Sequence, residues 1–305
     1  MRSRDLFAKE IAYLTEVMRT SDAEIVNAHW TYEYAEAAIR SSKPALITMR
    51  DLGWDYLFLF GDLYRLMRLV MKYRVMLRAR HVSAVSAFAA AKAWQYGYVG
   101  KVDVIPNPIS AAAAPEKTLE RPVIVTVGNA GRVKNVAASV AAFAVIRAAL
   151  PTAELHLFGP GLEPGGPFDK AESGIVCHGH VAHGELMRFL EKAAHLLVHP
   201  ARIETFGTIL AEAKTRGVPV IGGKNSGGVA YVVGEAGGML VDIERAEEIA
   251  EAAIGMLTNQ NDYAALQKAA HEDIAERFSV ERISCHYLQA YQRILENGTS
   301  TMAQP

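Results

Sequence analysis

The chain has 305 residues, of which 50% are hydrophobic and 21% charged, and its formal net charge is −1. This length suits two domains, and the composition is typical of a folded globular protein and excludes a disordered one. A nearly neutral chain gives no indication of nucleic-acid binding.

Two cysteines, Cys177 and Cys285, lack paired spacing, so we expect no disulfide framework and a reducing, cytoplasmic environment. The chain has no apolar stretch of the roughly 18 residues that a membrane span needs. The opening residues, MRSRDLFAKEIAYL, lack the apolar centre of a signal peptide. The sequence therefore predicts a protein that neither spans a membrane nor is secreted.

In the first third, short apolar runs alternate with amphipathic or Ala-rich segments, which indicates βα units and a parallel sheet. The runs are AEIVNAHW, ALITMRD, HVSAVS and VDVIPN. Four strands after one opening helix are fewer than a full doubly wound sheet has, and the Gly-rich first turn of such folds is missing. We therefore interpret residues 1–112 as an incomplete Rossmann-like domain.

Residues 63–81, LYRLMRLVMKYRVMLRARH, contain six Lys and Arg and no acid. Leu66, Val70, Tyr73 and Leu77 recur at helical spacing, which fits either an amphipathic helix lying on an anionic membrane or a core helix whose basic groups reach outward. Residues 1–112 carry fifteen Lys and Arg against eleven Asp and Glu, and the rest of the chain seventeen against twenty-two. This positive half slightly favours peripheral contact with the inner face of the cell membrane.

Residues 113–121 interrupt the pattern with Pro, Ala and charge, and we interpret them as a linker. Residues 122–278 then show a complete doubly wound α/β pattern. Its predicted strands are PVIVTVGN, AELHLFG, GIVCHG, HLLVHP, VPVIGG and GGMLVD. We expect residues 279–297 to form a helix that packs back toward the N-terminal domain.

The stretch HPARIETFGTILAEA places Glu204 in a loop after a predicted strand and Glu212 in the helix that follows, if that helix begins near Gly207. Ligands of open α/β sheets bind at the carboxyl ends of strands, so both carboxylates are expected in one cleft. Carboxylates accept hydrogen bonds from hydroxyl groups such as those of sugars and ribose. The alternative is two ordinary surface carboxylates, which composition alone favours.

The start of the same helix favours a ligand site. Gly207 permits close backbone approach, and the N–H groups of Phe206, Gly207 and Thr208 are expected to face outward as an anion site. Acceptors for hydroxyl groups beside a site for phosphate indicate a nucleotide sugar.

The segment TVGNAGRVKN supplies cations at the corresponding place in the first strand of this domain. Arg132 and Lys134 could neutralise a diphosphate there, although a turn with solvated basic residues explains this segment equally well. A dinucleotide site fits less well, because the G-x-G-x-x-G fingerprint is absent and no acidic residue ends the next strand.

Two features argue for other chemistry but weakly. Cys177, His178, His180 and His183 resemble a metal cluster, yet Cys177 and His178 point to opposite faces of a strand, so we expect no metal site. His29, taken alone, is more simply a hydrogen-bonded histidine at a strand end than a catalytic group.

Taken together, TVGNAGRVKN, LHLFGPG, HPARIETFGTILAEAKTRGVPVIGGKNSGGVAYVV and GGMLVD resemble, in order and spacing, the C-terminal domain of retaining glycosyltransferases of family 4, which have the GT-B fold. AEIVNAHWTYEYA, PALITMRD, VSAVS and VDVIPNP resemble later strands of that family's acceptor domain, so the resemblance covers nearly the whole chain. It implies two Rossmann-like doubly wound domains, the N-terminal one incomplete.

The resemblance also implies roles for single residues. Glu204 would bind donor-sugar hydroxyls, Glu212 the nucleotide ribose and Lys134 the diphosphate, and His29 would reach the reacting sugar from the other domain.

Two positions depart from the family pattern. Asn129 follows the strand-end glycine, Gly128, where the family usually has Arg, so either Arg132 replaces that contact from a shifted loop or the contact is lost. Arg50 stands where His is common.

The expected activity is metal-independent, retaining transfer of a hexosyl or related group from a nucleoside diphosphate sugar to a saccharide or lipid-linked acceptor. Such a role belongs in polysaccharide or glycolipid biosynthesis. No cofactor is expected, because the leaving diphosphate itself accepts the acceptor proton and no D-x-D motif occurs. A nucleotide-sugar-binding remnant or scaffold is the main alternative, and a sugar-nucleotide epimerase matches the Glu-x-Phe-Gly element less well.

The family's first strands and their Gly-rich loop are absent ahead of Met1. We therefore expect an unpaired sheet edge and exposed apolar surface in the first third. We also expect donor binding through residues 120–275 with little or no transfer by the chain as written.

Overall fold

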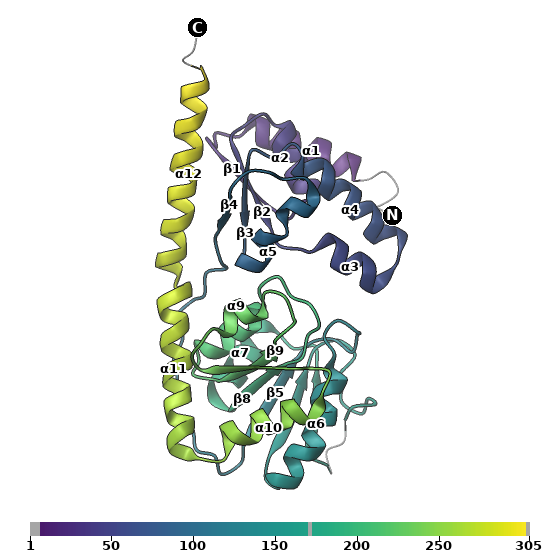
Figure 1. Cartoon of the computed structure of the whole chain (residues 1–305), viewed down its shortest axis with the longest axis vertical. Helices are drawn as coiled ribbons and strands as arrows, with labels where there is room; N and C mark the ends of the chain where they lie inside the picture. The colour runs from purple at the N-terminus through teal and green to yellow at the C-terminus, as the bar shows by residue number, and fades with distance from the viewer. Residues whose placement is uncertain (1–6, 170–172, 303–305) are drawn as a thin grey trace. The chain divides into compact units, whose positions relative to one another are not determined.

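The computed structural model describes residues 7–169 and 173–302 (Figure 1). They divide into two compact units. The first runs to Asn107 and takes in the chain from Glu281 onward, and the second is Pro108–Val280. The sequence placed its boundary slightly later, at residue 112.

The first unit contains a four-stranded parallel sheet in the order β1-β2-β3-β4, as the sequence predicts. Its strands are β1 (Val26–His29), β2 (Ala45–Met49), β3 (His81–Ala84) and β4 (Val102–Val104). Its helices are α1 (Ala8–Thr20), α2 (Glu33–Arg40), α3 (Gly53–Phe60), α4 (Leu63–Met76), α5 (Ala87–Ala91), the 3-10 helix η1 (Ala93–Tyr96) and α12 (Val280–Met302). β1 pairs only with β2 and forms one edge of the sheet.

Helices cover both faces of this sheet (Figure 1). On one face, apolar strand residues such as Ile47 and Val82 pack with the small side chains of α2 and with Leu69 and Val75 of α4. On the other, α12 packs Ile283, Ala290 and Ile294 against Leu46 and Ile105. The strands are thereby buried on both sides, which is usual for parallel sheets.

Helix α4 has both buried and exposed apolar residues. Leu69 and Met76 are buried in the core, as the core-helix interpretation expects. Three of the four residues of the predicted stripe remain exposed, however: Leu66 by 46%, Val70 by 52% and Leu77 by 67%. The helix therefore carries an outward apolar stripe that the core does not use.

The second unit contains a six-stranded parallel sheet in the order β10-β9-β8-β5-β6-β7. Its strands are β5 (Val123–Val127), β6 (Glu154–Phe158), β7 (Ile175–Gly179), β8 (Leu196–His199), β9 (Val220–Gly223) and β10 (Gly238–Val241). Its helices are α6 (Val136–Ala149), α7 (His183–Lys192), α8 (Thr208–Lys214), α9 (Val229–Val233), α10 (Ala246–Leu257) and α11 (Gln260–Phe278). All six predicted strands are present.

The strand order of this sheet reverses at β5, which pairs with β6 on one side and β8 on the other. Such a switch point opens a crevice at the carboxyl ends of the two strands, because the connecting loops leave in opposite directions. The residues predicted to bind the donor follow β5 and β8.

The segment predicted as a linker, residues 113–121, packs against the second unit. The Lys117 side chain is 7% exposed, and its carbonyl accepts a hydrogen bond of 2.8 Å from Gln260. Nζ of Lys117 lies 3.4 Å from the carbonyl of Leu190. Within the described residues, no helix is both long and apolar enough to cross a membrane.

Candidate functional site

The loop after β5 makes a tight turn over glycines. Gly128 donates a hydrogen bond of 2.9 Å to the Phe158 carbonyl at the end of β6. Gly159 has φ +132°, and a Cβ at that position would overlap the Gly128 carbonyl oxygen. A Cβ at Gly128 would lie 2.8 Å from Cβ of Lys134. The two glycines therefore let β5 and β6 end side by side and let Lys134 lie across the turn.

Lys134 and Glu204 form an ion pair that joins the loops after β5 and β8. His199, the last residue of β8 and 1% exposed, lies with Nε2 3.2 Å from Oε1 of Glu204. Burial opposes ionisation of Glu204, but the His199 hydrogen bond and the Lys134 charge outweigh it and lower the pKa to about 2. Glu204 is thus a carboxylate held ionised at the switch point.

The backbone of Glu204 is fixed by the loop after β9. Its N–H donates a hydrogen bond of 3.2 Å to the Ser226 carbonyl, and its carbonyl accepts one of 2.8 Å from the Gly228 N–H. A Cβ at Gly228 would overlap the Thr205 carbonyl oxygen, so the two loops pack backbone to backbone. This arrangement positions the carboxylate independently of any ligand.

Helix α8 begins at Thr208 after Gly207 with φ +84°, as the sequence predicts. Glu212 lies on this helix and pairs with His183 at the start of α7, with 2.9 Å between Oε1 and Nε2. Phe206 is 2% exposed and its ring packs against Phe278, so its side chain is not available to a ligand.

Asn129 and Arg132, which are also predicted to bind the nucleotide-sugar donor, are both exposed. Asn129 caps its own turn by accepting 3.0 Å from the Gly131 N–H. The Arg132 side chain is exposed, and its carbonyl accepts 2.6 Å from Arg202 Nη1. Arg202 is in turn paired with Glu244, so it anchors the loop that carries Arg132 and Lys134.

His29 lies in the first unit, at the end of β1. Arg50 Nε, at the end of β2, donates 2.7 Å to His29 Nδ1. Burial and the Arg50 charge lower the pKa of His29. The imidazole is therefore neutral at neutral pH, with its proton on Nε2.

Two of the residues that resemble a metal cluster, Cys177 and His178, serve packing instead. Cys177 is buried, whereas His178 lies on the other face of β7, where it stacks on Phe158 and contacts His156 at 2.8 Å. Among the described residues, no group of three or more His, Cys, Asp and Glu is placed to hold a metal ion.

The sequence of residues 111–273, more than half of the chain, matches the family described as glycosyl transferases group 1. The chain belongs to this family. Residues 2–113 of this group 1 glycosyltransferase match a second description, glycosyltransferase family 4. The predicted family is thereby confirmed over both units.

Similar curated proteins match over short stretches of their length. Sucrose-phosphate synthase 4 of Arabidopsis thaliana is 30% identical over 104 residues, 34% of this chain and 10% of that protein. Sucrose-phosphate synthase of Zea mays is 32% identical over 77 residues, 25% of this chain and 7% of that protein. The matched stretch thus spans a tenth or less of these two relatives.

Solved structures of glycosyltransferases share the fold over nearly the whole chain. Sucrose-phosphate synthase from Thermosynechococcus elongatus superposes with a TM-score of 0.78 at 20% identity, over 95% of this chain and 78% of that one. Anabaena HepE in complex with UDP and glucose superposes with a TM-score of 0.75 at 16% identity, over 95% of this chain and 83% of that one. The predicted GT-B fold is confirmed.

Two histidines of this group 1 glycosyltransferase hold the predicted carboxylates, although the sequence assigns them no such role. His199 holds Glu204 and His183 holds Glu212. His199 could have been suspected, because it ends a predicted strand directly before the loop of Glu204. In the sequence His183 resembles only a metal ligand, and no spacing links it to Glu212.

Proposed function

We propose that this protein transfers a glycosyl group from a nucleoside diphosphate sugar to an acceptor, with retention of anomeric configuration and without a metal ion. One observation carries the proposal: Glu204 lies ionised between Lys134 and His199 at the switch point of the second unit. Family membership supports it.

In this proposal the donor displaces the ion pair. The diphosphate binds Lys134 in place of Glu204, because two phosphate charges attract the ammonium more strongly than one carboxylate does. Glu204, still held by His199, then accepts hydrogen bonds from donor-sugar hydroxyls. Glu212 exchanges His183 for the ribose hydroxyls.

Retention requires no protein nucleophile, provided that the leaving diphosphate accepts the acceptor proton on the same face of the sugar. The protein then contributes position and charge, with Lys134 stabilising the departing phosphates. His29 would donate its Nε2–H to a hydroxyl of the reacting sugar, since Arg50 already occupies Nδ1.

We further propose that helices α3 and α4 contact an anionic membrane from its cytoplasmic side. Phe58, Leu63 and Leu66 are exposed by 80%, 79% and 46%. The neighbouring Arg74 and Arg80 are exposed cations. Apolar groups flanked by Arg suit the boundary between headgroups and acyl chains.

Turnover is tested by incubating the chain with UDP- or GDP-hexoses and a panel of saccharide and lipid-linked acceptors, and measuring released nucleoside diphosphate. UDP-hexoses come first, because Anabaena HepE is solved with UDP-glucose. Release should require an acceptor, persist in EDTA, and fall in Lys134→Ala. Proton NMR of the product should show the donor's anomeric configuration.

Nucleotide-sugar binding without turnover would support the scaffold instead. A strict requirement for a divalent ion would refute the metal-free mechanism, and an inverted product would refute retention.

A further inference from the structure

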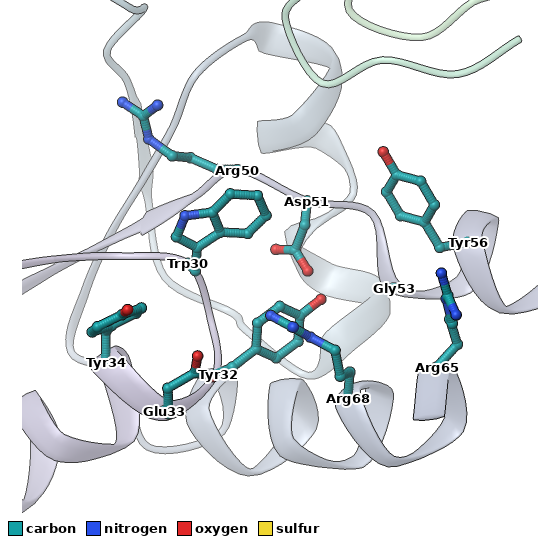
Figure 2. A pocket seen from close by; sticks show the side chains of 10 residues that line it. All are labelled: Trp30, Tyr32, Glu33, Tyr34, Arg50, Asp51, Gly53, Tyr56, Arg65 and Arg68. Atoms are coloured by element: carbon teal, nitrogen blue, oxygen red, sulfur yellow. The ribbon is translucent and has the colours of Figure 1, made fainter. Parts of the chain in front are cut away.

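A cavity of about 440 Å³ lies in the first unit at the carboxyl ends of β1 and β2 (Figure 2). Aromatic side chains, two carboxylates and three arginines share its wall. The lining residues are Trp30, Tyr32, Glu33, Tyr34, Arg50, Asp51, Gly53, Tyr56, Arg65 and Arg68.

Asp51 is a buried acceptor with one oxygen unused. Its side chain is 3% exposed, and Oδ1 accepts from Thr31 Oγ1 at 3.1 Å and from Lys72 Nζ at 3.2 Å. Oδ2 is buried and has no hydrogen-bond partner among the described residues, and neither has Oε2 of Glu33. Buried carboxylate oxygens without partners are costly, so both suit a ligand that donates hydrogen bonds.

Two arginines of α4 bring positive charge to the same cavity. Arg68 stacks over the Tyr32 ring at 3.7 Å and donates 2.6 Å to the Tyr64 hydroxyl. Arg65 is held by Asp62 at 2.6 Å. Figure 2 shows Arg68 beside the Asp51 and Tyr32 side chains, whereas Arg50 points away from them. A fixed guanidinium beside unused acceptors is suited to a phosphate or carboxylate group.

The aromatic wall offers a stacking surface. Trp30 is 44% exposed and adopts φ +76°, a left-handed conformation that is strained for a bulky residue. Its backbone is held there, since its N–H donates 3.0 Å to the Thr48 carbonyl. Tyr34 is 45% exposed nearby. Exposed aromatic faces of this kind pack against the apolar faces of sugar rings.

We infer that this cavity binds a saccharide carrying an anionic group, either phosphate or carboxylate. Asp51 and Glu33 receive its hydroxyl hydrogens, Arg68 and Arg65 hold the anion, and Trp30 packs on the ring. Identification of this ligand as the glycosyl acceptor rests on the proposed function. The binding itself does not.

Simpler ligands fit less well. A cation would meet Arg68, which already covers the Tyr32 ring. An anion without hydroxyl groups would leave the two carboxylate oxygens unpartnered and close to its own charge. An anionic saccharide satisfies both sets of groups.

Binding is measured with the full chain, without donor, by calorimetry and by tryptophan fluorescence. The probes are glucose, mannose and galactose, the 6-phosphate of each, glucuronate, and inorganic phosphate. At least one 6-phosphate or glucuronate should bind about tenfold or more tightly than its neutral sugar and than phosphate alone. The 6-phosphates and glucuronate distinguish a phosphate group from a carboxylate.

Three variants locate the site. Arg68→Gln should remove the preference for the anionic sugar over the neutral one. Glu33→Gln should weaken binding of both sugars and leave that preference in place. Arg74→Gln, the same change on an exposed arginine of α4, is the matched control and should bind as the wild type does. Circular dichroism checks that each variant is folded.

No binding of any probe, equal binding of neutral and anionic sugars, or phosphate binding as tightly as the sugar phosphates would each overturn the inference. Equal losses in Arg68→Gln and Arg74→Gln would do so too. UDP and GDP binding, measured in the same samples, reports on the second unit and separates this failure from a failure of the proposed function.

Discussion

Glu204 and Glu212 look alike in the sequence, but the structure gives them different surroundings. Glu204 is held by a lysine and a buried histidine, which keep it ionised with a pKa of about 2. Glu212 has the exposed His183 as its partner. A partner that solvent reaches is easily displaced by a ligand, which fits the assignment of Glu212 to the ribose.

Glu212→Ala should weaken nucleoside diphosphate binding by about 1–3 kcal/mol, the usual effect of removing a charged hydrogen-bond partner. Glu204→Ala should leave nucleoside diphosphate binding largely intact and impair recognition of the donor sugar. Calorimetry with UDP or GDP, and with the corresponding nucleotide sugars, measures both. Equal losses of UDP or GDP affinity in the two variants would contradict this division of roles.

His29 should titrate below its ordinary pKa, because burial and the Arg50 charge disfavour protonation. A lowered folded pKa means that the neutral form is retained as pH falls through about 6.5, the unperturbed value. Protonation at lower pH then costs stability. Arg50→Gln should raise the pKa, although burial will keep it below the unperturbed value.

The imidazole proton resonances of His29 in NMR spectra report this titration without requiring turnover, and His29→Gln assigns them. Arg78→Gln is a control, since that arginine pairs with Glu36. An unchanged His29 pKa in Arg50→Gln would show that the contact carries no electrostatic effect.

At the scale of elements, the sequence predicted the strands of both sheets and the start of α8 well. Apolar runs and glycines are local signals, and Gly207 with positive φ marks the helix start directly. The Lys134–Glu204 pair could not be predicted, because it depends on β5 and β8 becoming neighbours in the sheet.

The linker prediction shows a related limit. Pro, Ala and charge in residues 113–121 indicate a linker, and they give no sign that Lys117 is buried against the second unit. Composition describes what a segment resembles in isolation, whereas packing depends on the surface beside it.

Gly159→Ala should strongly destabilise the second unit and abolish nucleoside diphosphate binding. Its φ is +132°, and a Cβ would overlap the Gly128 carbonyl, so the turn that carries Lys134 must move. Gly255→Ala is the matched control, because that glycine lies exposed in α10 with nothing within 4 Å of a Cβ. This change should raise the free energy of unfolding by about 0.5–1 kcal/mol.

Thermal unfolding and UDP or GDP calorimetry compare the two glycine variants. If Gly159→Ala bound as tightly as the wild type, close approach of the β5 and β6 ends would not be required for the site.

The outward stripe of α4 should bind vesicles that contain anionic lipid. The double variant Leu63→Ser, Leu66→Ser removes two exposed apolar side chains and should lower cosedimentation with phosphatidylserine vesicles severalfold. Val145→Ser is the control, because Val145 is 46% exposed, as Leu66 is, but lies on α6 of the second unit. Cosedimentation that is equal for the wild type and the double variant would refute this contact.

For the whole molecule, most of the groups proposed for the two partners lie in different units. The second unit has the ionised carboxylate and lysine suited to a nucleotide sugar, and the first has the aromatic cavity. The uneven charge in the sequence, positive in residues 1–112 and negative beyond, agrees with such a division.

The most direct test of this account is acceptor-dependent release of nucleoside diphosphate from a nucleotide sugar, measured with the purified chain in EDTA. The account predicts that release requires the acceptor, that the product keeps the donor's anomeric configuration, and that Lys134→Ala lowers the rate by tenfold or more, which corresponds to about 1.4 kcal/mol in the barrier. Donor binding with no acceptor-dependent release for any pair of donor and acceptor would contradict it, and would agree instead with the expectation from the sequence that this chain binds the donor with little or no transfer.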